Sequence, residues 1–142
     1  MSQYSPGEAP VRTADLGNLV TLTHLIYALH AFAVLTGVVG SATIIGSFVA
    51  SVPSIVAVVL NYLKRGAVRG TWLESHFRWQ IRTFWFALLW IVIAAFLVLS
   101  LIGIPFALAL MAGAGLWVTY RVVRGWWNLL DRSGMPMPPP QP

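Results

Sequence analysis

The chain has 142 residues, of which 58% are hydrophobic and 9% are charged, with a formal net charge of +5 and a mean hydropathy of +0.76. This composition excludes an ordinary soluble domain and indicates a membrane protein. The absence of cysteine excludes disulfides, thiolate nucleophiles and Cys-ligated metal centres. Because the basic residues stand beside long apolar runs, we expect anionic lipid headgroups as partners and no nucleic acid.

Two long runs of the sequence carry no Asp, Glu, Lys or Arg, one between Asp15 and Lys64 and the other between Arg82 and Arg121. A helix needs about 20 residues to cross about 30 Å of hydrocarbon, so each run predicts two crossings. The predicted fold is therefore an all-α, four-helix transmembrane bundle. The expected spans cover residues 18–39, 42–63, 83–101 and 105–120.

The two ends of the chain differ in composition from this membrane domain, which we place at residues 18–132. Residues 1–17 mix small, polar and charged side chains without periodicity, so we expect a flexible N-terminal tail. Residues 133–142 are rich in proline and are expected to be disordered.

The segment at residues 71–82 predicts an amphipathic interfacial helix that leads into the third span. Thr71 and Glu74 have the Ser/Thr-x-x-Glu spacing of a capping box, which predicts a helix start at Thr71. Glu74, Arg78 and Arg82 recur every fourth residue and share one face, with aromatic side chains on the others.

Topology follows from the positive charges, which gather in the central loop and after the fourth span, while the two short turns carry none. The positive-inside rule therefore places the N-terminus, central loop and C-terminus in the cytoplasm of a bacterial inner membrane. The N-terminal tail contributes little to this argument, since Arg12 is outnumbered by Glu8 and Asp15.

The basic residues at these two places form a predicted cytoplasmic collar interleaved with tryptophans. Its headgroup-binding candidates are Lys64, Arg65, Arg69, Arg78, Arg82, Arg121 and Arg124. Its candidate interface anchors are Trp72, Trp79, Trp85, Trp126 and Trp127. The collar is explained by topology and anchoring alone, or by those roles together with a binding site for anionic lipid such as cardiolipin.

The spans hold no acidic or basic residue apart from histidine, which weakens a reading as an ion or proton transporter. His24 and His30 are about 240° apart around a helix and do not share a face. His24 and His76 could meet at one depth as haem or metal ligands, but the favoured interpretation is two interfacial imidazoles bonded to water, hydroxyls or backbone. No catalytic or phosphate-binding motif is present, so we expect neither enzymatic activity nor a cofactor.

The segment from Glu74 to Trp85 (ESHFRWQIRTFW) resembles a loop-to-helix motif of small bacterial membrane proteins that are similar to the Tic-twenty-type component of chloroplast protein import. In that family a polar residue, an aromatic or aliphatic pair and a glutamine open the third span, as His76, Phe77 and Gln80 do here. The resemblance covers most of residues 18–132. It implies a four-helix membrane fold with cytoplasmic ends, no catalytic residues and a place beside other membrane proteins.

Three functions are compatible with these features. The leading hypothesis is a non-enzymatic accessory or scaffold subunit that contacts anionic lipid and either other integral membrane proteins or copies of itself. The second is a small channel or transporter component, because hydroxyl side chains at spacings of four, four and three line one face of the second span beside Pro53. The candidate polar path consists of Thr43, Ser47, Ser51 and Ser54. The third is a haem or metal carrier that uses His24 and His76.

Overall fold

The computed structural model describes the backbone of residues 13–40, 44–100 and 102–136, and the side chains of residues 13–37, 51–100 and 102–136. The described chain is all-helical. Its helices are α1 (Thr13–Gly40), α2 (Ile44–Lys64), α3 (Leu73–Leu99) and α4 (Ile104–Leu130). The predicted four-helix, all-α architecture is thus confirmed.

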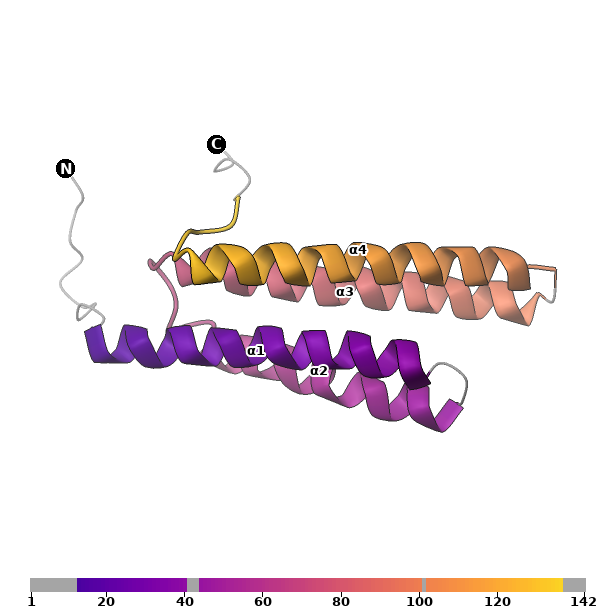
Figure 1. The fold of residues 1–142 in the computed structure, drawn as a ribbon, viewed down its shortest axis with the longest axis horizontal. Helices are drawn as coiled ribbons and strands as arrows, with labels where there is room; N and C mark the ends of the chain where they lie inside the picture. The colour runs from indigo at the N-terminus through magenta and orange to yellow at the C-terminus, as the bar shows by residue number, and fades with distance from the viewer. Residues whose placement is uncertain (1–12, 41–43, 101, 137–142) are drawn as a thin grey trace.

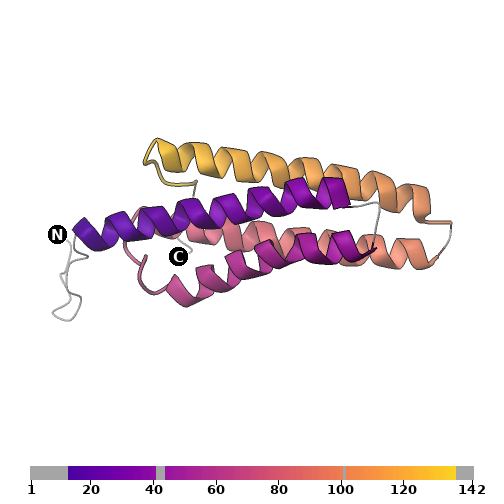
Figure 2. The same cartoon turned by 60° about the horizontal axis from the view of Figure 1, so that its bottom comes forward.

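The helices form two antiparallel hairpins, α1 with α2 and α3 with α4 (Figure 1). The end of α1, the beginning of α2, the end of α3 and the beginning of α4 lie at one end of the bundle, and the beginning of α1, the α2–α3 connection and the end of α4 lie at the other (Figures 1 and 2). We call the latter the terminal end. Contacts between the hairpins are made chiefly by α1 against α4.

Three helical segments of the described chain are long and apolar enough to cross a membrane: Thr13–Gly37, Leu73–Leu99 and Ile104–Leu130. Their 25 to 27 residues correspond to about 38 to 40 Å, which exceeds the hydrocarbon thickness of about 30 Å. The protein therefore has the helices of a multi-pass membrane protein. α2 has 21 residues and continues through Pro53, and its crossing stays a prediction.

Buried side chains gather toward the terminal end of the bundle. The largest fully buried ones are Tyr27, Phe77 and Ile26, and they belong to a cluster shared by all four helices. Gly125 of α4 lies directly against the Tyr27 ring of α1, where a Cβ atom would overlap the hydroxyl. This glycine therefore sets the close approach of the two hairpins.

Three expectations about element ends are wrong. α1 begins at Thr13, so residues 13–17 are helical and not part of a flexible tail. α3 begins at Leu73 after Trp72 as N-cap, and no side chain caps it. The capping box does not form, because Thr71 donates to the Val68 carbonyl (2.7 Å), while the Glu74 carboxylate accepts the backbone N–H of Gly70 (3.0 Å).

The third difference concerns the predicted C-terminal tail, whose first residues pack against α3. The Ser133 carbonyl accepts a hydrogen bond from His76 Nε2 (2.8 Å), and the Met135 N–H donates to Ser75 Oγ (2.8 Å). Met135 is buried as a result. Residues 133–136 therefore form an ordered strap across the start of α3, because buried polar groups on α3 supply partners for its backbone.

Candidate functional site: an arginine cluster beside tryptophans on α3 and α4

Arg121 is the most constrained basic side chain of the described residues. It lies on α4, and its guanidinium carbon is 3.5 Å from the ring centre of Trp79 on α3 and 5.0 Å from that of Trp117. Its Nε donates to Thr83 Oγ1 (2.7 Å), and its Nη2 donates to the Trp79 carbonyl (3.4 Å). In return, the Trp79 indole N–H donates to the Arg121 carbonyl (3.0 Å). These contacts fix the cation at the seam between the two helices.

Two more cations act on Arg121 electrostatically, Arg82 from α3 and Arg124 from α4. Arg124 lies over the Tyr120 ring at 5.8 Å and donates to the Tyr120 hydroxyl (2.5 Å). We call Arg82, Arg121 and Arg124 the arginine cluster. Within residues 13–37, 51–100 and 102–136, no carboxylate forms an ion pair with any of its members.

The remaining basic residues of the predicted collar form a separate group at the α2–α3 connection. Arg65, Arg69 and Arg78 line a small pocket of about 180 Å³ that also contains Glu74. Glu74 neutralises part of this charge, since it forms an ion pair with Arg78 (2.7 Å). Lys64 is exposed at the end of α2. The collar is therefore divided into two groups. The group at the α2–α3 connection includes the Glu74 carboxylate. The arginine cluster includes no carboxylate among the described side chains.

The predicted tryptophan anchors have different roles. Trp85 and Trp127 are exposed, and the Trp85 indole donates to the Tyr62 hydroxyl (2.9 Å). Trp126 is half-buried and donates to His24 Nδ1 (3.1 Å). Trp72 packs edge-on against His76, and Trp79 lies under Arg121. Only the first two have the exposure expected of anchors in an interface, while Trp126 and Trp79 join different helices and Trp72 packs on the start of α3.

The two histidines considered as metal ligands are engaged within the protein. His76 is fully buried, its Nε2 donates to the Ser133 carbonyl, and its Nδ1 accepts the Tyr27 hydroxyl at 3.0 Å. Water, hydroxyls or backbone are the expected partners, and His76 has a hydroxyl and a backbone carbonyl, at a position that is buried. Both ring nitrogens of His76 have partners, so metal binding would require breaking one of these bonds. No group of three or more metal-ligating His, Cys, Asp or Glu side chains occurs among the described residues.

The candidate polar path is only partly covered by the structure. Thr43 lies outside the described residues, and so does the side chain of Ser47. Ser51 is exposed and has a partner, and Ser54 is half-buried and bonded to His30 Nδ1 (3.1 Å). Ser54 therefore joins α1 to α2 through this hydrogen bond.

Two residues of these networks, Trp117 and Tyr27, are not among the predicted site residues. Trp117 stands four residues before Arg121, a spacing that puts both on one helix face and could have revealed the contact. Tyr27 gives no comparable signal, because its partner is distant in sequence. Asn61 and Gln80 are buried with both side-chain amide atoms unpartnered among the described residues, as is His30 Nε2.

The chemistry of the arginine cluster is that of an anion site. A guanidinium presents five N–H donors in a planar fork that fits phosphate, and the bonds of Arg121 to Thr83 and Trp79 use only part of this capacity. Nothing in the cluster supplies a nucleophile or a general base. Comparison with protein-family models, curated proteins and solved structures finds no match to this chain.

Proposed function

We propose that this chain is a non-enzymatic, multi-pass protein of a bacterial inner membrane that binds anionic phospholipid headgroups at its cytoplasmic face. The observation that carries the proposal is Arg121, fixed between Trp79 and Trp117 and accompanied by two more cations with no carboxylate counterpart in the described chain. Placing three cations together at the end of membrane-spanning helices is costly unless negative charge from the surroundings compensates them.

An accessory or scaffold role in a larger membrane assembly is the second part of the proposal. It is supported by the large apolar side chains that α3 and α4 leave exposed toward their connection, including Phe96, Leu99 and Phe106. Such side chains contact lipid tails or the helices of neighbouring proteins equally well. The resemblance of the Glu74 to Trp85 segment to proteins that work beside other membrane proteins agrees with this role.

The headgroup site is tested by native mass spectrometry of the protein released from nanodiscs of mixed phosphatidylglycerol and phosphatidylcholine. One basic residue near a membrane surface contributes about 1 kcal/mol, so Arg121→Gln is expected to lower the affinity for the anionic headgroup about fivefold and to reduce the anionic lipid retained. Arg132→Gln removes the same charge from an exposed turn outside the cluster and is the matched control. Equal loss in both variants, or none in either, would mean that the cluster is not a headgroup site.

A further inference from the structure

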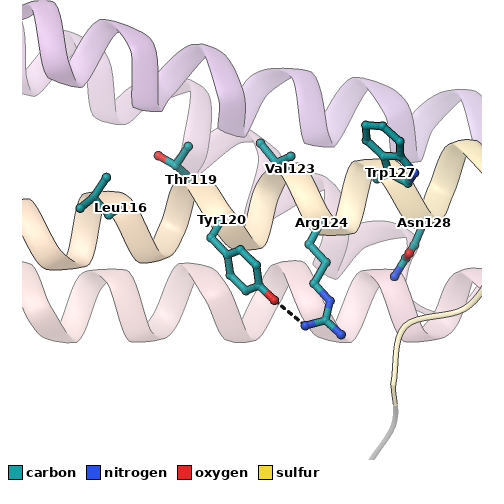
Figure 3. A pocket seen from close by; sticks show the side chains of 7 residues that line it. All are labelled: Leu116, Thr119, Tyr120, Val123, Arg124, Trp127 and Asn128. Atoms are coloured by element: carbon teal, nitrogen blue, oxygen red, sulfur yellow. Dashed lines mark hydrogen bonds between the residues drawn. The ribbon is translucent and has the colours of Figure 1, made fainter.

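The exposed face of α4 carries a groove between two ridges of side chains, with a volume of about 470 Å³ (Figure 3). One ridge consists of Thr119, Val123 and Trp127, and the other of Tyr120, Arg124 and Asn128. Residues four apart stand on one row of a helix surface, which explains why the two sets form parallel ridges. We call this feature the α4 groove.

Polarity changes along the α4 groove. Arg124, Asn128 and the indole of Trp127 lie at its end toward the terminal end of the bundle. Its other end is formed by Leu116, which is 74% exposed, and between them Val123 contributes an apolar wall. The distance from Asn128 to Leu116 along the helix is about 18 Å. The groove therefore has a cationic end toward the terminal end of the bundle and an apolar end toward the beginning of α4.

Two occupants match an apolar groove on a membrane helix, a lipid chain and a helix of a second copy. Symmetric dimers in a membrane have their two-fold axis along the membrane normal, so identical residues meet at equal depth. An α4–α4 contact along this groove would bring Arg124 of one copy against Arg124 of the other, and among the described residues no carboxylate forms an ion pair with Arg124. Charge therefore disfavours the second copy, whereas a phosphate compensates the same cation.

We infer that the α4 groove holds one acyl chain of an anionic phospholipid whose phosphate lies on Arg124. Trp127 at the polar end of the groove has the amphipathic ring that favours headgroup depth. The polar end followed by the apolar end of the groove matches the headgroup followed by the acyl chain of the lipid. This inference rests on the proposed headgroup site and names the lipid chain that accompanies the headgroup.

The test uses full-length protein in nanodiscs that contain phosphatidylglycerol with a photoactivatable group in one acyl chain, followed by peptide mapping. Leu116 is expected to be labelled about fivefold more than Leu89 of α3, a 49% exposed side chain near the same level of the bundle. The excess should disappear in Arg124→Gln, which removes the charge, and in Val123→Trp, which fills the groove without changing charge. Phosphatidylcholine with the same chain should label the two leucines only in proportion to their exposure, 74% for Leu116 and 49% for Leu89.

A ratio of Leu116 to Leu89 labelling that is the same for phosphatidylglycerol and phosphatidylcholine would overturn the inference. The two proposals fail differently. One outcome is that Arg121→Gln loses anionic lipid in the nanodisc assay but Leu116 is not labelled more, relative to Leu89, by phosphatidylglycerol than by phosphatidylcholine. The headgroup site then stands, and only the acyl-chain site in the α4 groove is wrong. If wild-type protein retains anionic and zwitterionic lipid alike, the headgroup site itself is wrong.

Discussion

At the scale of single residues, the same residue type has different physical consequences at different places. Gly125 faces the Tyr27 ring, whereas Gly113 of the same helix has open space where a Cβ would stand. Likewise, Arg78 is paired with a carboxylate, and Arg121 is held by aromatic rings and neutral acceptors. Composition and spacing do not separate these cases, because the distinction depends on which helix lies opposite.

Gly125→Ala is expected to destabilise the protein by about 1–3 kcal/mol, because the added methyl group must displace Tyr27 or separate α1 from α4. Gly113→Ala is the control on the same helix and should be neutral or stabilising by up to about 1 kcal/mol, since alanine is the better helix former. Unfolding in detergent micelles measures both. Equal stability of the two variants would show that Gly125 is not a point of close approach.

At the scale of helices, hydropathy and charge in the sequence predict the helices themselves. Features that depend on tertiary contacts are not predicted. The uncharged runs predict the helices, and the glycine and proline at positions 103 and 105 mark the start of α4. The start of α1 at Thr13 and the strap at residues 133–136 are missed. Both segments are polar or proline-rich, and the strap is ordered by partners on α3 that are distant in sequence.

The strap gives a prediction at this scale. Ser75→Ala removes the acceptor of the Met135 N–H, a hydrogen bond worth about 1 kcal/mol, so exchange of that amide with deuterium should become about fivefold faster. Ser100→Ala, at the α3–α4 connection, is the control and should leave this amide unchanged. Unchanged exchange in Ser75→Ala would show that the strap is not held through this hydroxyl.

At the scale of the whole molecule, the beginning of α1, the α2–α3 connection and the end of α4 lie together at the terminal end (Figures 1 and 2). The arginine cluster forms only at this scale, since Arg82 and Arg121 belong to different helices. The sequence predicts all three of its members within a larger collar. It does not separate them from the group that contains Glu74, because that division follows from helix packing.

The absence of native cysteine makes membrane topology directly measurable. We expect Ala14→Cys, Gly66→Cys and Ser133→Cys to react with an impermeant maleimide only from the cytoplasmic side, and Ile102→Cys only from the opposite side. Spheroplasts and inverted vesicles provide the two sides. Labelling of Ala14→Cys from outside would mean an odd number of crossings and would exclude α2 as a span.

The central claim is that Arg82, Arg121 and Arg124 together bind anionic phospholipid. Its most direct test is the phospholipid that copurifies from native membranes with wild type, with a triple Gln variant of the cluster, and with a control triple Gln variant at Lys64, Arg65 and Arg132. The cluster variant should lose the excess of anionic over zwitterionic lipid, because its three cations are expected to bind one headgroup together, while the control variant, which removes three charges outside the cluster, should keep most of that excess. An unchanged lipid ratio in the cluster variant would contradict the account.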